Sequence, residues 1–316
     1  MSSSRAFRLS APLVAIGAAL WGTDPLFRLP LATHFASVTV VLGEHLVLFP
    51  FALAMAAPTL GKLRRLTLWD WGSLLAIAWG ASALATALFT TAFAAATPIT
   101  AILLQKLQPL FALMGARLVL GERLPPRFAL YVLPCLAGSY LVSFGFAAPA
   151  NLTASSLVGP VCAVTAAALW GMGTVFGRHL MSRLTFREMT AYRFLFALPF
   201  LVVLNAALGG VRQVGHLSAA GGSVVALALL PGLVSLLLYY RGLAGVQASV
   251  ATLLELAYPA TGVLVGYLAL HERVDAGQAL GFALIWLMAG LLSRQKPVPV
   301  KTVAGATAPL GATSAG

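Results

Sequence analysis

Charged residues are scarce in this chain of 316 residues: Asp, Glu, Lys and Arg together make up 9% of it, and only 8 residues are acidic. A soluble domain carries about 25% charged residues, so a soluble fold is excluded. Cysteine is scarcer still, with Cys135 and Cys162 alone. Both fall within apolar runs, where a thiol behaves as a small hydrophobic side chain, and they say nothing about a redox compartment.

Motifs for nucleotide hydrolysis and for common enzyme sites are also missing. The single Gly-Lys pair, Gly61-Lys62, lies in a short loop without the glycine spacing of a P-loop, which excludes an ATP-driven pump. No nucleophile stands beside a base, so no enzyme activity is expected. His45 and His179 have no metal-ligand partner at a useful spacing, and we expect neither a metal nor another cofactor.

Hydrophobic residues make up 60% of the chain and gather in long runs. A helix needs about 20 apolar residues to cross the roughly 30 Å core of a bilayer, and these runs lack the short alternating segments of a membrane β-barrel. The connections are too short for a soluble domain. The sequence therefore predicts an all-α polytopic membrane protein with ten transmembrane helices, at residues 10–30, 36–57, 70–92, 98–120, 128–147, 156–178, 187–209, 222–242, 248–270 and 277–293.

The net charge of +12 raises the question of nucleic-acid binding, which the placement of the charges answers. With ten spans and a cytoplasmic N-terminus, fifteen Lys and Arg residues fall on the cytoplasmic side, and Arg28, Arg212 and Arg273 on the other. This is the positive-inside pattern of membrane proteins, so nucleic-acid binding is rejected. We expect a multi-pass protein of the inner (plasma) membrane with an uncleaved first span and with both termini cytoplasmic.

The sequence repeats itself at an offset of about 150 residues. Residues 19–27 (ALWGTDPLF) align with 168–176 (ALWGMGTVF), and 88–124 align with 238–274. Each repeat holds five predicted spans, so the second copy must enter the membrane upside down, and inverted repeats are typical of secondary transporters. The predicted domains are a first repeat at 1–148, a second repeat at 149–294 and a disordered tail at 295–316.

Several landmarks recur at matching places in the repeats. They are the pairs Trp21-Gly22 and Trp170-Gly171, the mid-span Pro109 and Pro259, the motifs LGERL and LHERV, and Gly138, Gly281 and Gly290 in the last spans. In these features the chain resembles, over about residues 10–293, the EamA-type branch of the drug/metabolite transporter (DMT) superfamily. The resemblance implies ten helices in two inverted five-helix repeats, with a central cavity walled chiefly by the third and fourth helices of each half. Bacterial members include exporters of amino acids and other metabolites.

Two of the apolar runs carry polar residues where hydrocarbon is expected, at corresponding places in the repeats. These residues are Gln105, Lys106, Gln108 and Pro109 in the first half, and Glu255, Tyr258 and Pro259 in the second. At 1.5 Å per residue, Lys106 and Glu255 lie roughly 10–12 Å deep. A charge at such depth is expected to face a cavity or a partner, and the prolines leave backbone carbonyls exposed.

The functional interpretation is that Lys106 attracts an anionic group of the substrate, while Glu255 attracts an ammonium or carries a proton. Gln105, Gln108 and Tyr258 then supply hydrogen bonds. The alternative is structural: Lys106 and Glu255 neutralise one another and hold the two halves together. The sequence leaves both open.

Aromatic residues give further candidates. Trp21, Trp79 and Trp170 could stack on a substrate, although tryptophan also serves at membrane interfaces and in packing. Tyr239, at the inner end of the eighth span, could line or gate the substrate pathway, or could anchor its helix at the interface.

Charged residues in the first and second spans are candidates for coupling or for an ion pair. Asp24 lies beside Pro25, a further helix-breaking proline, and could equally be a solvated cap. The family often has Arg in the second span of a repeat, as at Arg193, where the first half offers Glu44. The symmetry suggests that these two could pair within the membrane.

The favoured function is a secondary-active transporter that exports amino acids or similar zwitterionic metabolites by alternating access around a midplane cavity. Its partners would be a small-molecule substrate, the lipid bilayer, and a coupling proton or counter-substrate. One alternative is an antiporter of phosphorylated or nucleotide-linked organic anions, which would need more basic groups. Another is a non-transporting scaffold or sensor. The oligomeric state is left open.

Overall fold

The structure, a computed structural model, describes residues 3–95, 104–105, 107–122, 129–144, 146, 158–270 and 276–293. Every regular element within these residues is a helix, so the predicted all-α class is confirmed. Lys106, a predicted substrate-binding residue, and the predicted tail lie outside the described residues.

The helices follow one another in the order of the predicted spans. The first half forms α1 (Ser3–Trp21), α2 (Asp24–Ala32), α3 (Ser37–Ala56), the 3-10 helix η1 (Ala57–Arg65), α4 (Leu68–Leu75), the π-helix η2 (Ala76–Leu84), α5 (Ala85–Ala95), α7 (Gln108–Val119) and α8 (Ala129–Phe144). The second half forms α9 (Val158–Leu180), α10 (Phe186–Ala207), α11 (Val211–Val214), the 3-10 helix η3 (Gly215–Ala220), α12 (Gly221–Leu227), the π-helix η4 (Ala228–Val234), α13 (Ser235–Leu243), α14 (Ala248–Leu254), α15 (Ala257–Leu270) and α16 (Ala276–Ser293).

Five helical stretches are long and apolar enough to cross a membrane: Ser37–Arg65, Leu68–Ala92, Val158–Leu180, Phe186–Ala207 and Val211–Leu243. They coincide with the second, third, sixth, seventh and eighth predicted spans. The remaining predicted spans are interrupted, shorter, or partly outside the described residues, so the total of ten stays a prediction. Large apolar side chains such as Leu118 and Val203 are exposed, as a lipid-facing surface requires.

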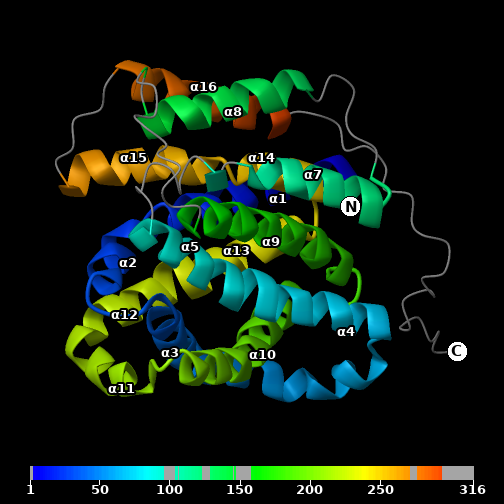
Figure 1. Cartoon of the computed structure of the whole chain (residues 1–316). Helices are drawn as coiled ribbons and strands as arrows, with labels where there is room; N and C mark the ends of the chain where they lie inside the picture. The colour runs from blue at the N-terminus through cyan, green and yellow to red at the C-terminus, as the bar shows by residue number, and fades with distance from the viewer. Residues whose placement is uncertain are drawn as a thin grey trace, which may run out of the picture.

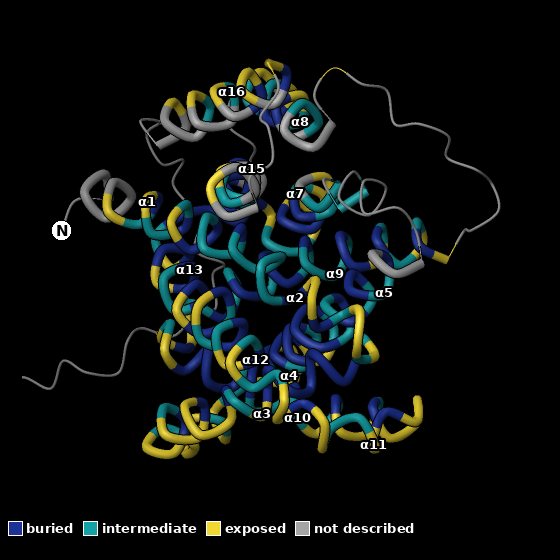
Figure 2. The backbone as a smooth tube through the Cα atoms, turned by 90° about the vertical axis from the view of Figure 1, so that its left-hand side faces the viewer, coloured by how far each residue is buried: buried dark blue, intermediate teal, exposed yellow. Residues whose placement is uncertain are grey.

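Equivalent helices of the two halves pack against each other. α3 packs on α10 and α8 on α16, at opposite edges of the bundle, and α7 contacts α14 (Figure 1). The first helix of each half packs on the third helix of the other, α1 on α13 and α9 on α5. Buried positions gather in the middle of the bundle, and exposed positions lie on outward sides such as that of α16 (Figure 2). The halves are therefore interleaved around a shared centre.

The glycine of each Trp-Gly pair allows a close approach to the fourth helix of the other half. A Cβ at Gly22 would lie 2.7 Å from Thr261 Cβ on α15, and a Cβ at Gly171 would lie 2.9 Å from the Gln108 carbonyl oxygen on α7. Both distances are too short for a side chain, which explains why the Trp-Gly pairs need glycine. The tryptophan beside each glycine is thereby held at the centre of the bundle.

Three of the predicted spans are interrupted near their middle. The interruptions lie between α1 and α2, just before α7, and between α14 and α15. A proline stands in the first turn of each helix that follows, namely Pro25, Pro109 and Pro259. Proline suits that position because the first turn of a helix has no use for the missing N–H. Each interruption thus precedes its proline by a few residues.

The third helix of each half contains a π-helical stretch, η2 in the first half and η4 in the second. π-Helical turns are rare and are frequent at functional sites. These two lie at equivalent places in the repeat and next to the centre of the bundle.

Candidate functional site

A cavity lies between the two halves of the chain. Its volume of about 190 Å³ is more than ten times the roughly 15 Å³ that a single water needs, so it has room for an organic molecule. Side chains from the first four helices of each half line it. The wall is therefore wider than the resemblance implied, because the first and second helices contribute as well as the third and fourth.

Glu255 lies at the interruption between α14 and α15 and is buried at the cavity wall. Tyr239 donates a hydrogen bond of 2.7 Å and Thr174 one of 3.0 Å to its Oε1, and the Gln108 amide donates to its Oε2. Three neutral donors surround the carboxylate and stabilise its negative charge. Gln108 belongs to the first half and the other donors to the second, so the site joins the halves.

Gln105 extends this network from the other side of the interruption before α7. Its Nε2 donates to Gln108 Oε1 over 3.0 Å. Its Oε1 is buried and accepts no hydrogen bond from any described residue. Among the described residues, the network therefore ends at the cavity in an acceptor without a donor.

Aromatic rings supply much of the apolar wall. Trp21 packs on Tyr239 with ring centroids 5.1 Å apart, and Trp170 packs on Phe89 at the same distance. Trp170 also donates from Nε1 to the Ala81 carbonyl oxygen over 2.9 Å, which fixes the orientation of its ring. Tyr258 lines the cavity as well. Of the predicted aromatic residues, Trp21, Trp170, Tyr239 and Tyr258 are brought together here.

Trp79 lies elsewhere, and its predicted place in the cavity is wrong. Its side chain is 43% exposed, stacks on Phe200 and donates to the Phe196 carbonyl oxygen over 3.0 Å. The inward face of η2 is occupied by buried small residues, among them Ala81 and Ser82, so position 79 turns outward. Trp79 packs on α10 at the periphery.

Arg193 lines the cavity with its guanidinium held by neutral groups. Its Nε donates to Ser82 Oγ and its Nη1 to Tyr240 OH, both over 2.8 Å, and its Nη2 donates to the Ala81 carbonyl oxygen over 3.3 Å. No carboxylate of the described residues pairs with it. The proposed pair of Arg193 with Glu44 is therefore wrong, because Glu44 has another partner.

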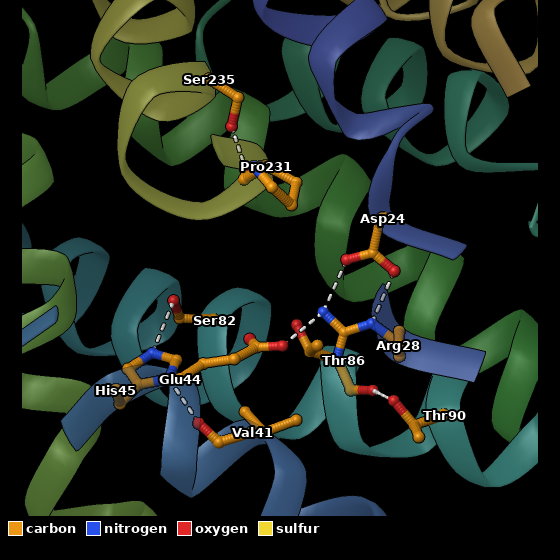
Figure 3. Close-up of polar contacts among 10 residues, drawn as sticks. All are labelled: Asp24, Arg28, Val41, Glu44, His45, Ser82, Thr86, Thr90, Pro231 and Ser235. Carbon is orange, nitrogen blue, oxygen red and sulfur yellow. Dashed lines mark hydrogen bonds and ion pairs between the residues drawn. The ribbon is translucent and has the colours of Figure 1, made fainter. Parts of the chain in front are cut away.

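That partner is Arg28 on α2 (Figure 3). Arg28 makes two hydrogen bonds to Asp24, one turn earlier, from Nε at 2.6 Å and from Nη2 at 2.7 Å. Its Nη2 also lies 2.6 Å from Glu44 Oε1. Asp24 is thus the partner of a buried arginine at the cavity rather than a solvated cap.

Arg28 and Thr174 are among the cavity residues that sequence reasoning missed. Arg28 was counted only among the basic residues of the outer side, although its spacing of four from Asp24 on a helix favours an ion pair and signalled a shared face. Thr174 carries no comparable signal, because a single threonine within an apolar helix bonds a backbone carbonyl as readily as a ligand.

Within the described residues, no group of three His, Cys, Asp or Glu side chains could hold a metal ion. His45 contacts the Val41 carbonyl oxygen at 2.9 Å and Ser82 Oγ at 3.4 Å. His179 pairs with Asp70 at 2.8 Å, away from the cavity.

Comparison with known proteins places this architecture in a family. The chain matches the EamA-like transporter family twice, over residues 9–144 and 157–294. The riboflavin transporter ImpX of Fusobacterium nucleatum is 31% identical over 267 residues, which cover 82% of this chain and 88% of that protein. The uncharacterized transporter YoaV of Bacillus subtilis is 26% identical over 135 residues, 43% of this chain and 46% of that protein.

A solved crystal structure of a protein superposes with a TM-score of 0.75 at 21% identity, covering 90% of this chain and 98% of the other; this likeness supports the fold. The apolar helices and the relatives indicate a multi-pass membrane transporter rather than an enzyme. With two matches that together span most of its length, this chain belongs to the EamA-like transporter family.

Proposed function

We propose that this chain is a secondary-active carrier that moves a flat heteroaromatic metabolite of the flavin class across the inner membrane through its central cavity. The observation that carries the proposal is the aromatic wall formed by Trp21, Phe89, Trp170, Tyr239 and Tyr258. Aromatic faces stack favourably on flat ring systems. The relative named as a riboflavin transporter, similar over most of both chains, supports the same class of substrate.

The polar groups of the wall also suit a flavin. The pyrimidine edge of its ring system carries an imide N–H between two carbonyl oxygens. Among the described residues, Gln105 Oε1 is a buried acceptor and Arg28 Nη1 a buried donor, each without a hydrogen-bond partner. A ligand that satisfies both would remove the cost of leaving buried polar groups unpaired.

Alternating access is supported by the way the halves share the cavity. We infer ten spans arranged as two inverted repeats, divided near residue 148, with both termini cytoplasmic. The fourth helices are interrupted just before Gln108 and at Glu255, and interrupted helices at the midplane are where secondary transporters bind their substrates. Rocking of one half against the other around this point would open the cavity to each side in turn.

A second candidate substrate is a zwitterionic amino acid, as the sequence favoured. One observation supports it: the cavity holds the cation Arg193 and the anion Glu255, each surrounded by neutral partners. The carboxylate of an amino acid would suit Arg193, and its ammonium would suit Glu255.

Phosphorylated or nucleotide-linked anions suit the cavity less well. Its described wall carries the carboxylates of Asp24, Glu44 and Glu255 against the guanidiniums of Arg28 and Arg193. Among the described residues, a multiply charged anion would therefore meet more carboxylates than guanidiniums.

The test is counterflow in proteoliposomes. Vesicles are preloaded with unlabelled riboflavin or with pooled amino acids, and uptake of the labelled compound is followed. Empty liposomes measure leakage, and the Glu255→Gln variant tests whether uptake depends on the cavity.

Riboflavin uptake that needs both preload and Glu255 would support the leading candidate. Uptake of amino acids alone would favour the second candidate. Uptake of neither compound in vesicles of demonstrated integrity would reject both substrates.

A further inference from the structure

A charge imbalance is buried where α2 meets α3. Arg28 is 8% exposed, and its guanidinium contacts the carboxylates of Asp24 and Glu44 (Figure 3). With both carboxylates ionised, the cluster carries one net negative charge. An uncompensated charge is expensive within a membrane, so the cluster favours the uptake of one positive charge.

Glu44 is the more weakly held of the two carboxylates. Asp24 accepts two hydrogen bonds from Arg28. Glu44 Oε1 lies 2.6 Å from Arg28 Nη2 but without the alignment of a hydrogen bond, and this ion pair is its one polar contact with a described residue.

Other buried acids of the described chain are better supported. Glu255 accepts from three side chains. Glu188 accepts from Lys62 Nζ over 2.7 Å and from the Thr185 backbone N–H over 2.9 Å. Hydrogen-bond donors stabilise the ionised form of a carboxylate. Glu44 therefore has the least to lose on binding a proton.

Among the described residues, Asp24 and Arg28 are the charged groups that face Glu44. His45, next along α3, turns to the Val41 carbonyl oxygen and to Ser82. Arg193 of α10, which packs on α3, is bound to Ser82 and Tyr240 instead. The described parts of α5, α12 and η4, which also contact α3, bring no Asp, Glu, Lys, Arg or His. η1 and α11 contact α3 as well, but their basic residues Lys62, Arg64, Arg65 and Arg212 are exposed, unlike the buried Glu44.

The same ion pair ties α2 to α3. α2 is nine residues long and is joined to α1 through the interruption at Gly22 and Thr23, so it can pivot without bending a continuous helix. Its remaining packing is on α12 and on the apolar face of α3. Within the described residues, the Arg28–Glu44 pair is the ion pair that joins α2 to α3.

We propose that Glu44 binds the coupling proton of this carrier and that its protonation releases α2 from α3, an inference that rests on the function proposed above. The proton converts Glu44 to a neutral acid and leaves Arg28 paired with Asp24, so the cluster becomes electrically neutral. The ion pair that joins α2 to α3 is lost. α2 then swings at the interruption and opens its side of the cavity, and loss of the proton restores the pair.

The first experiment detects the proton without any substrate. Infrared difference spectra between acidic and neutral pH are recorded for the full chain in lipid, as wild type, Glu44→Gln and Glu188→Gln. Glu188→Gln is the matched control, because Glu188 is also a buried glutamate in an ion pair but does not line the cavity. We expect a protonated carboxyl band that is present in the wild type and the control and absent from Glu44→Gln. An unchanged band in Glu44→Gln would overturn the proposal.

The second experiment separates exchange from coupling. Riboflavin counterflow and riboflavin accumulation driven by an imposed pH gradient are measured in the same proteoliposomes. We expect Glu44→Gln to keep at least half of the wild-type counterflow and to lose at least 90% of the accumulation, while Glu188→Gln keeps both.

Accumulation that persists in Glu44→Gln, or that follows a sodium gradient in place of the pH gradient, would also overturn the proposal. Absence of counterflow in the wild type would count against the flavin substrate. The infrared result would still decide whether Glu44 binds a proton.

Discussion

Gln108 of α7 donates a hydrogen bond to Glu255 at the break between α14 and α15. The two residues come from equivalent helices of the two halves, each next to an interruption. The contact therefore joins the repeats at the point where both helices lose their regular backbone, beside the cavity. Four predictions test how the site depends on this arrangement.

Replacement of Glu255 by Gln should abolish most transport. The change keeps the size of the side chain but removes the charge that Tyr239, Thr174 and Gln108 surround. Hydrogen bonds to a charged group contribute about 1.5–3 kcal/mol each, so a loss of one such bond predicts a fall in counterflow rate of about ten-fold to a hundred-fold. Glu188→Gln is the control. Equal counterflow rates in the two variants would show that Glu255 is not part of the substrate site.

Lys106→Ala should also abolish counterflow. Lys106 lies outside the described residues, but its neighbours Gln105 and Gln108 both line the cavity. We expect a basic side chain between them to bind the substrate or to neutralise Glu255. Arg117→Ala, which removes an exposed cation from α7, should leave counterflow near the wild-type rate. Wild-type rates in Lys106→Ala would contradict the role.

Trp170 and Trp79 should differ sharply when each is replaced by Ala. Trp170 lines the cavity and Trp79 lies at the periphery. Loss of one stacking ring costs about 0.5–1.5 kcal/mol beyond its buried area, so the KM for riboflavin should rise about ten-fold in Trp170→Ala. Trp79→Ala should leave KM near the wild-type value. The KM values come from initial rates of uptake, and a larger effect at Trp79 would show that the cavity has been assigned to the wrong face of η2.

Gly171→Ala should destabilise the fold, because the added Cβ would lie 2.9 Å from the Gln108 carbonyl oxygen. Overpacking of this kind costs about 1–3 kcal/mol, and we expect a clearly lower Tm in detergent. Gly72→Ala is the matched control, since a Cβ there meets nothing within 4 Å and alanine favours a helix. Its Tm should equal or exceed that of the wild type. Equal Tm values in the two variants would mean that α7 and α9 can separate freely.

The sequence predicted the all-α class, the broken fourth helices and much of the cavity wall. Polar residues within hydrocarbon are so costly that Gln105, Gln108 and Glu255 stand out without any structure. Their meeting follows from the internal repeat, which sets equivalent helices side by side.

Other features depend on geometry that a linear pattern does not contain. Arg28 stands at the end of an apolar run, where arginine ordinarily faces water, and only the interruption at Gly22 turns it inward. Trp79 was assigned to the cavity by residue type, yet the small residues of η2 fill the inward face. The Glu44–Arg193 pair followed from repeat symmetry, but Arg28 lies closer to Glu44 and Arg193 is held by Ser82 and Tyr240.

The π-helical stretches η2 and η4 bear on how the chain can change in length. A π-helical turn takes up an extra residue while the helix on each side keeps its orientation, so deleting one residue from η2 would let it relax into an α-helix with Phe89 of α5 still at the cavity. Inserting a residue into the regular part of the same helix would instead turn everything beyond it by roughly 100° and carry Phe89 out of the cavity. The π-helical stretches are therefore the places where the third helix of each half can lose a residue, and other variation in length belongs in the connections between helices.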